Sequence, residues 1–536
     1  MSQAEAEAKI DKKGSDNNRT RRFWILTIFF LITVILCVLS FYILSDKELY
    51  YPYRLSFTLS LIKNFYPEAY DAGQMMALAR DGVMEQLDRY SGYLEPEDFD
   101  RVNEEFTGAY AGIGITVAGH NSGLMVMSVR EDGPAGQTGI KTGDIIIRVD
   151  TTEVAGMAPY RATFLLRGPV DTKLTVFIAR NNMRDTLSFT LNRKKLKLIH
   201  LAYAGLTPNK YLYLRLLDFE SGTAEDVRAA LDSLYLNGNK SVKGIILDLR
   251  GNPGGLLGEA ITVSDYFLNK GHLIVGIKGR SRWYQSEFYT SHRDLTNGLP
   301  MAIIVDRGSA SASEIFAGAM KYAGRAVLVG DTTFGKGLVQ EFDELYDGSA
   351  LRLTTARYYF EGNIFLNDPK SPVKDSAAGI SPDYYFKWME DEPFPLWLEN
   401  SLLLREYANL YQDAIISGPE RLNDSLERLE SFIGFIRKKN FDFESELTQT
   451  TQQAREEIKR GGYNEKTAAI ISQIYRLAKQ DDSAQSLHYK DYIEQRLYQI
   501  ALETKFGFDT AYRKAILPYR QDILFAEEIL AKRDDH

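Results

Sequence analysis

The sequence predicts an α/β fold: a mostly parallel sheet at the centre, a β-rich domain before it and an all-helical domain after it. Between residues 194 and 390, β-branched runs alternate with helical patterns, as they do in parallel sheets covered by helices. From residue 105 to 193 the pattern is instead that of short strands joined by glycine turns. Over residues 391–536, leucine and tyrosine recur three and four positions apart, which predicts helices.

Composition limits the classes of function. A chain of 536 residues is too long for one ordinary core, so we expect three or four domains. A net charge of −8 leaves no basic stripe, which argues against nucleic acid as a partner. The single cysteine, Cys37, cannot form an internal disulfide, so stability must come from packing.

The N-terminus predicts a membrane anchor. Residues 1–22 are polar, end in arginines and are expected to form a disordered cytoplasmic tail. Residues 23–44 carry no charge and are long enough to cross a bilayer as a helix. The alternative is a cleaved signal peptide, but no small-x-small cleavage site follows. The positive-inside tendency therefore predicts a single-pass protein of the cytoplasmic (inner) membrane, with its later domains in the periplasm or outside.

Residues 49–104 are predicted to form an N-terminal helical region; helical spacing over residues 49–88 ends in a turn at residues 87–94, and the region shows no chemistry. Residues 105–193 then give a glycine-entered strand, a second strand, a short helix from Pro134 towards Ile140, a buried strand, a helix over 160–166 and a closing hairpin. This order resembles a PDZ domain of the circularly permuted kind found in bacterial proteases. The resemblance implies capture of a peptide C-terminus as an added strand. The N–H groups that would receive the carboxylate belong to Gly112, Ile113, Gly114 and Ile115.

Three loops follow strands of the predicted parallel sheet. They are a glycine loop (residues 250–255), a serine corner (residues 306–313) and a lysine loop (residues 331–337). Because functional loops of such sheets gather at the carboxyl ends of the strands, we expect the three to meet in one crevice.

The serine corner and the lysine loop together suggest a nucleophile and its base. On local grounds Ser309, Ser311 and Ser313 are equivalent. A serine hydroxyl attacks an amide only if a base takes its proton, and Lys336 could do so if burial lowered its pKa. Gln340 lies at an even offset along the following strand and could orient the amine.

Two other site classes are less well supported. Residues 330–336 match Gly-x4-Gly-Lys, but Gly337 replaces the Ser or Thr of a phosphate-binding loop and a strand follows in place of a helix. The histidines are scattered and no cysteine pair exists, so we predict no metal site. No histidine lies in the three loops either, which disfavours a Ser–His triad. The six are His120, His200, His272, His292, His488 and His536.

The three loop motifs, in this order after a PDZ-like domain, resemble the C-terminal processing peptidase (tail-specific protease) family over about residues 50–390. The resemblance implies a crotonase-like α/β core that needs no cofactor. It also implies that Ser311 is the nucleophile, Lys336 the general base and Gln340 the third member. Ala312 and Gly255 fall where the family places its oxyanion donors.

The family also gates its core through the PDZ domain, and Arg167 is our candidate for that role. Residues 358–363 depart from the family's small turn, and the helical tail has no recognisable motif, so packing, homo-oligomerisation and adaptor binding stay open for it. The sequence thus predicts a membrane-anchored serine endopeptidase that recognises protein C-termini. A non-catalytic PDZ scaffold and a protease that needs an activating partner are the alternatives.

Overall fold

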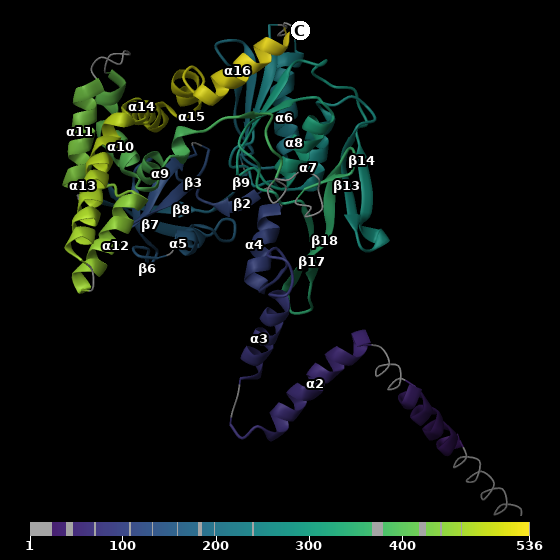
Figure 1. Cartoon of the computed structure of the whole chain (residues 1–536). Helices are drawn as coiled ribbons and strands as arrows, with labels where there is room; N and C mark the ends of the chain where they lie inside the picture. The colour runs from purple at the N-terminus through teal and green to yellow at the C-terminus, as the bar shows by residue number, and fades with distance from the viewer. Residues whose placement is uncertain are drawn as a thin grey trace, which may run out of the picture. The chain divides into compact units, whose positions relative to one another are not determined.

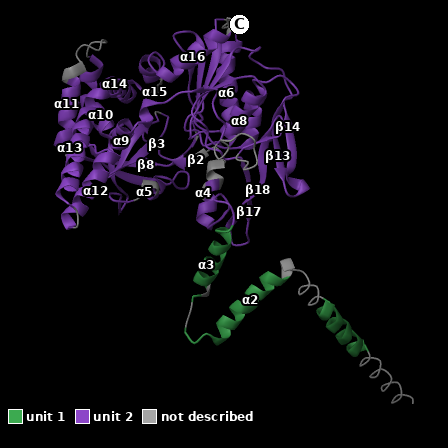
Figure 2. Ribbon diagram, in the orientation of Figure 1, with its two compact units in different colours: residues 1–86 green, residues 87–536 purple. Residues whose placement is uncertain are grey.

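The computed structural model describes residues 24–38, 47–68, 71–106, 109–130, 132–157, 159–180, 185–197, 199–237, 241–366, 379–417, 425–439, 442–461 and 464–534. The chain forms two compact units, residues 1–86 and residues 87–536 (Figure 2).

The first unit is helical where it is described. Residues 24–38 form one helix, followed by α2 (Lys47–Phe65) and α3 (Ala72–Met84), and Asp71 caps α3 by accepting hydrogen bonds from the N–H groups of Gly73 and Gln74. No helix in the described part of this chain is both long and apolar enough to span a membrane. The predicted tail and parts of the predicted anchor, residue 23 and residues 39–44, lie outside the described residues.

After β1 (Gly92–Leu94) and α4 (Pro96–Phe106), the second unit contains the predicted PDZ domain, a sheet in the order β3-β4-β5-β7-β8. Its strands are β3 (Ile115–His120), β4 (Gly123–Val129), β5 (Ile145–Val149), β7 (Lys173–Arg180) and β8 (Asp185–Asn192), with β6 (Thr152–Glu153) beside β5 and helix α5 (Pro159–Leu166) packed on β3. Alternating inward side chains such as Val126, Ile146 and Val176 fill its core. The short helix predicted from Pro134 to Ile140 is wrong: the segment is a series of turns, because glycine recurs every third residue there.

The strand that leads into the PDZ domain pairs with the strand that leaves it. Strand β2 (Ala109–Gly112) runs antiparallel to β9 (Lys194–Lys197). Entry and exit of the inserted domain therefore lie side by side, and β2 leads directly into the predicted carboxylate-binding turn.

The core contains the predicted parallel sheet, in the order β10-β11-β12-β15-β16-β20. Its strands are β10 (Leu201–Leu206), β11 (Tyr211–Leu216), β12 (Gly244–Asp248), β15 (Met301–Val305), β16 (Val327–Gly330) and β20 (Tyr384–Tyr385). From β11 onward every neighbour is parallel. Strands β12, β15 and β16 are buried along their whole length, as continuous apolar runs covered on both faces must be. Helices α6 (Thr223–Leu231), α7 (Leu257–Asp265) and α8 (Ala312–Tyr322) belong to the hydrophobic cluster on one face (Figure 1).

A second, antiparallel sheet stands beside the first. It contains β1 (Gly92–Leu94), β13 (Leu273–Gly279), β14 (Gln285–Tyr289), β17 (Leu338–Glu344), β18 (Ala350–Phe360) and β19 (Ile364–Phe365). A mostly parallel sheet was predicted over residues 194–390, but β13, which lies between β12 and β15 in the chain, is not part of it, because β12 pairs directly with β15. Strand β13 instead returns through a hairpin to β14.

The helices of the predicted helical tail contribute to two hydrophobic clusters, one formed within the tail and one shared with the parallel sheet. Helices α9 (Pro393–Asn400), α10 (Leu403–Ser417), α11 (Ser425–Lys438) and α14 (Lys490–Phe506) share one cluster, while α12 (Glu446–Arg460) packs on α13 (Glu465–His488). The single helix predicted over residues 396–415 is two, since Leu402 adopts a φ of +60°. After α15 (Phe508–Ala511) and the π-turn at Tyr512–Ile516, helix α16 (Gln521–Asp534) lies across β12, β15 and β16 (Figure 1). It covers the face of the parallel sheet opposite α6, α7 and α8.

Candidate active site

The serine corner packs directly against the glycine loop. The Ser309 hydroxyl donates to the Leu249 carbonyl at 2.8 Å, and the Ala310 N–H donates to the Asn252 carbonyl at 3.0 Å. Gly254 has a φ of +101°, and a Cβ on it would lie 2.8 Å from the Ser311 Cβ. Only glycine allows this approach, so the Gly-Gly pair of the motif places the loop backbone beside Ser311.

The surroundings of the three serines distinguish them. Ser309 and Ser313 are fully buried, and the Ser313 hydroxyl donates to the Asn252 carbonyl at 3.0 Å. Ser311 is partly exposed and has a φ of +55°, a strained conformation for a residue with a Cβ. Ser309 and Ser313 therefore hold the corner, and Ser311 presents its side chain at the head of α8. Local sequence could not separate these roles.

Glu314 joins the serine corner to the lysine loop. Its side chain is fully buried, and Oε2 accepts the N–H of Ser311 at 2.9 Å and the N–H of Lys336 at 2.8 Å. Oε1 accepts the Gly335 N–H at 2.7 Å and the Thr333 hydroxyl at 2.6 Å. Burial raises the pKa of the Glu314 carboxyl, and these donors oppose the rise. One oxygen thus fixes the backbones of the predicted nucleophile and base close together.

Lys336 lies in the setting that its predicted role requires. Burial lowers the pKa of its amine, the nearby Arg352 cation lowers it further, and Glu314 opposes them. Its Nζ faces the ring of Tyr90, 5.5 Å from the centroid. No hydrogen bond joins Lys336 Nζ to Ser311 Oγ among the described residues. The loops are thus assembled while the amine is turned towards Tyr90.

Gln340 is in β17, where a bulge between Val339 and Gln340 shifts the register with β18. Its amide Nε2 is buried and finds no hydrogen-bond partner in the described part of the chain. Alternation along one strand cannot by itself place Gln340 on the same side as Lys336, because β17 begins only at Leu338 and a bulge follows. Since a strand follows Gly337, the loop also lacks the helix N-terminus that a phosphate-binding loop needs.

The two predicted oxyanion donors have suitable backbone positions. Ala312 is the first residue of α8, so its N–H has no acceptor within the helix. Around Gly255, the Gly254 carbonyl accepts the Phe219 N–H at 2.9 Å and the Phe219 carbonyl accepts the Leu256 N–H at 2.8 Å. This pairing uses the groups on either side of Gly255 and leaves its own N–H on the opposite side of the strand.

Three residues of this site were missed by the sequence analysis: Glu314, Tyr90 and Arg352. Glu314 was visible only as the start of a helix. Tyr90 lies in the turn at residues 87–94, which was considered free of chemistry, and that turn is tied to β18 because the Thr354 hydroxyl donates to Asp88 at 3.0 Å. Arg352 is one charge on a long strand, and nothing local indicates that it faces Lys336.

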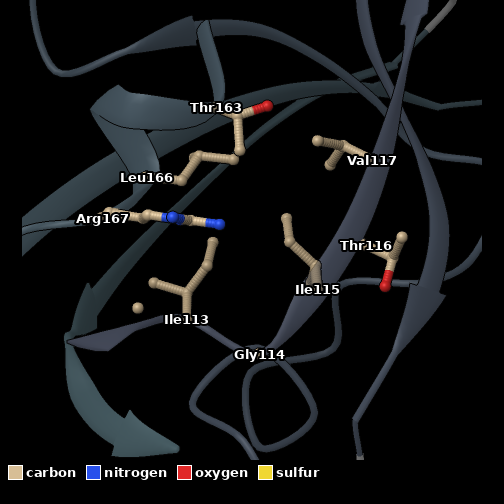
Figure 3. A pocket seen from close by; sticks show the side chains of 9 residues that line it. Ile113, Gly114, Ile115, Thr116, Val117, Thr163, Leu166 and Arg167 are labelled. Atoms are coloured by element: carbon tan, nitrogen blue, oxygen red, sulfur yellow. The ribbon is translucent and has the colours of Figure 1, made fainter. Parts of the chain in front are cut away.

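The predicted peptide-binding residues line a pocket of about 250 Å³ in the PDZ domain. It lies between the start of β3 and helix α5, with Ile113, Ile115, Val117 and Leu166 around it (Figure 3). Gly112 and Gly114 form its backbone edge, and the Arg167 side chain points into it. An apolar pocket beside β3, which is an edge strand of its sheet, is suited to a chain end with an apolar last residue.

The described residues offer no candidate metal site. Within the described ranges, no group of three or more His, Cys, Asp or Glu side chains is arranged to hold an ion. The buried His200 pairs through Nδ1 with Asp218 at 2.6 Å, outside the three loops.

Comparisons with known proteins agree with this architecture. Residues 210–386 match the model of peptidase family S41, residues 111–191 a PDZ domain model, and residues 397–530 the model described as a probable PDZ-protease C-terminal helical domain. The "Carboxy-terminal-processing protease" of Bartonella bacilliformis is 34% identical over 335 residues, covering 62% of this chain and 74% of that protein. The "Carboxy-terminal processing protease CtpA" of Bacillus subtilis is 31% identical over 332 residues, covering 62% and 69%. A solved photosystem II D1 C-terminal processing protease is 27% identical, with a TM-score of 0.38, covering 64% of this chain and 89% of that one.

Proposed function

Because this chain belongs to the C-terminal processing peptidase family, we propose that it is a membrane-anchored endopeptidase that selects proteins by their C-terminal tails and cleaves them through a Ser–Lys acyl-enzyme. Family membership makes the chain a serine-type peptidase. The observation that carries the Ser–Lys part of the proposal is the buried Glu314 carboxylate, whose Oε2 accepts the backbone N–H groups of both Ser311 and Lys336.

In the proposed reaction, Ser311 Oγ attacks the carbonyl carbon of a peptide bond while the neutral amine of Lys336 takes its proton. Burial and the Arg352 cation support this role because both favour the neutral amine. The N–H groups of Ala312 and Gly255 stabilise the developing oxyanion. Lys336 then gives the proton to the leaving amine, and water hydrolyses the ester in a second, equivalent step.

Lys336 must turn from Tyr90 towards Ser311 for this reaction, and Gln340 is proposed to hold it there. There Gln340 would accept an amine N–H of Lys336 through its Oε1, which leaves the lone pair of Nζ for the Ser311 proton. The Gln340 side chain can take up this role because its buried Nε2 has no hydrogen-bond partner among the described residues that would hold it in place. In the same proposal, the PDZ pocket binds the substrate C-terminus through the N–H groups of residues 112–115, and Arg167 senses the occupied pocket.

The proposed location is the cytoplasmic membrane, with the N-terminus inside and the PDZ and peptidase domains outside. The charge-free segment over residues 23–44 and the arginines before it support this orientation. Protease treatment of intact cells, with and without opening the outer surface layers, tests it. Protection of residues 87–536 from protease after those layers are opened would contradict the proposal.

The peptidase proposal is tested with Ser311→Ala and Lys336→Ala in the full chain, using a denatured protein with an apolar C-terminus as substrate. Each variant should lose cleavage by at least roughly a thousandfold while keeping its affinity for the C-terminal peptide. Ser264→Ala is the matched control, since Ser264 is also a fully buried serine but lies in α7, outside the three loops. Equal turnover by Ser311→Ala would refute the Ser–Lys mechanism, and no cleavage by the folded wild-type chain would favour the non-catalytic scaffold. Cleavage only after addition of cell extract would favour a partner-activated protease.

A further inference from the structure

Helix α16 brings a buried carboxylate to the back of the candidate active site. Asp522, in its first turn, is 1% exposed, and the helix lies across the same strands, β12 and β16, whose ends carry the glycine and lysine loops. The position comes from the helical tail, in which the sequence shows no chemistry.

One partner of Asp522 stands at the root of the glycine loop. Arg250 is the first residue of that loop, and its guanidinium forms a buried ion pair with Asp522. The same guanidinium binds Asp248, the last residue of β12, with Nη2 2.5 Å from Oδ2, and the Arg250 N–H donates to Asp248 Oδ1 at 3.0 Å. Arg250 is therefore held on one side by the sheet and on the other by α16. The loop that leads from it carries Gly254, which touches Ser311, and Gly255.

A second partner stands at the root of the lysine loop, and a third, Arg520, lies just before α16 and donates to both carboxylate oxygens of Asp522. Trp388 donates its indole N–H to Asp522 Oδ2 at 3.0 Å. Its ring lies on Gly330, where an added Cβ would come 2.5 Å from the ring, and Gly330 is the last residue before the loop that carries Lys336. The Arg250 guanidinium lies 5.6 Å from the same ring. Asp522, Arg250 and Trp388 thus form one buried cluster behind two of the three loops.

We propose that Asp522 is a positioning residue for peptide-bond cleavage, which fixes the glycine loop and the lysine loop relative to each other through Arg250 and Trp388. The inference rests on the proposed function, because that function places an oxyanion donor, Gly255, in the glycine loop and the base, Lys336, in the lysine loop. Removing the carboxylate would leave a buried guanidinium without one of its two anions, which forces Arg250 to move. A displacement of about an ångström at reacting groups can lower a rate about a hundredfold, so the effect falls on turnover rather than on substrate affinity. The helical tail is then part of the catalytic unit and not an appendage to it.

The chain offers a matched control on the same helix. Glu527 is 5% exposed and accepts hydrogen bonds from Thr207 and, at 2.7 Å, from Asn209. It therefore ties α16 to the turn between β10 and β11, which contributes to none of the three loops. Asp522→Asn and Glu527→Gln each neutralise one buried carboxylate of α16, but only the first touches the cluster behind the loops.

We expect Asp522→Asn, in the detergent-solubilised full chain, to lower kcat for a peptide with an apolar C-terminus by roughly tenfold or more, with KM changed by less than about twofold. Glu527→Gln should keep both constants within about twofold even where it lowers the unfolding temperature. If Asp522→Asn does not fold, Trp388→Phe keeps the ring, removes the N–H donor and should lower kcat in the same direction. An unchanged kcat in the folded Asp522 or Trp388 variant, or an equal loss in Glu527→Gln, would overturn the inference.

Hydrogen exchange separates this inference from the proposed function. Amides of residues 250–256 and 331–337 should exchange faster in Asp522→Asn than in the wild-type chain and in Glu527→Gln, whether or not the protein cleaves peptides. If the wild-type chain cleaves nothing, the proposed function fails, and this comparison still decides the role of Asp522. Unchanged exchange in both loops would refute it.

Discussion

At the scale of single residues, Glu314 does the most for the geometry of the site. A neutral glutamine has one acceptor and one donor group, whereas the two Glu314 oxygens accept from four donors. In Glu314→Gln, the side-chain NH2 group would therefore face two of these four donors inside the protein, and an NH2 group cannot accept their hydrogen bonds. We expect the free energy of unfolding to fall by about 1–3 kcal/mol and cleavage by the folded enzyme to fall by roughly tenfold or more.

Denaturant unfolding and peptide cleavage, measured on the same preparation, check this prediction for Glu314. Asp294→Asn is the control, because the buried Asp294 also accepts two backbone N–H groups, those of Thr296 and Gly298, in the segment before β15 and away from the three loops. The control should lose stability without loss of turnover per folded molecule. Full activity in Glu314→Gln would mean that the two loops hold their spacing without it.

Arg352 provides a second prediction, on pH dependence. The proposed base is the neutral amine, so kcat/KM should rise with pH through the pKa of Lys336. Arg352 lowers that pKa, so Arg352→Gln should raise it and move the acidic limb of the pH–rate profile to higher pH. Arg357→Gln is the control, because Arg357 lies on the same strand but is exposed. Coincident acidic limbs for Arg352→Gln and the wild-type chain would contradict the assignment of Lys336 as base.

At the scale of elements, α10 joins the PDZ domain to the helical tail. Glu406 on this helix accepts from His120 of β3 at 3.3 Å and pairs with Lys439, just after α11, at 2.5 Å. Burial by itself raises the pKa of Glu406, but hydrogen bonds from His120 and Lys439 and their charges bring it below its ordinary value. A single carboxylate thus connects β3 with two helices of the tail.

We expect Glu406→Gln to loosen this contact, because the neutral amide accepts more weakly from His120 and forms no ion pair with Lys439. Limited proteolysis should then cut the linkers around β2 and β9 faster than in the wild-type chain, while the peptidase core stays intact. Asp413→Asn serves as the control, since Asp413 is on the same helix but pairs with Lys505 within the tail. Identical cleavage patterns in Glu406→Gln and the wild-type chain would show that the contact does not hold the domain.

At the scale of the whole molecule, the buried carboxylates of Asp522 and Asp248 make the free energy of unfolding depend on pH. Burial alone raises the pKa of Asp522, but Arg250 and Arg520 outweigh it and lower the pKa from 3.8 to about 2. Arg215 and Arg250 likewise hold the pKa of Asp248 well below its usual range despite burial. A carboxyl whose pKa is lower in the folded chain stabilises the fold above its unfolded value, and this stabilisation is lost as pH falls through the folded value.

The lowered pKa of Asp522 corresponds to about 2 kcal/mol of unfolding free energy, present above a pH of about 4 and lost as pH falls towards about 2. Urea unfolding between those two pH values should show this loss in the wild-type chain and a smaller loss in Asp522→Asn. Parallel curves for the two proteins would show that Asp522 does not titrate with folding.

The sequence by itself determined the order of domains and the identity of the motifs. Strand and helix periods, the glycines of the glycine loop and the residue types of the serine corner are local properties, which survive without knowledge of the fold. They were sufficient for the family resemblance, for the strands that end at the three loops and for the pocket-lining turn at residues 112–115. The chemistry of Ser311 and Lys336 could be named because few residue types can act as nucleophile and base.

Only the tertiary structure decided the features that depend on contacts between distant segments. It buried Ser309 and Ser313 and left Ser311 partly exposed, placed β13 in the second sheet, and brought the Tyr90 ring and the charge of Arg352 near enough to act on Lys336. It also laid α16 over the parallel sheet, although the periodicity of the tail predicts only more helix. The physical reason is the same in each case. The periodicity of a segment shows which of its faces is buried. The side chains and charges that pack against that face belong to segments elsewhere in the chain.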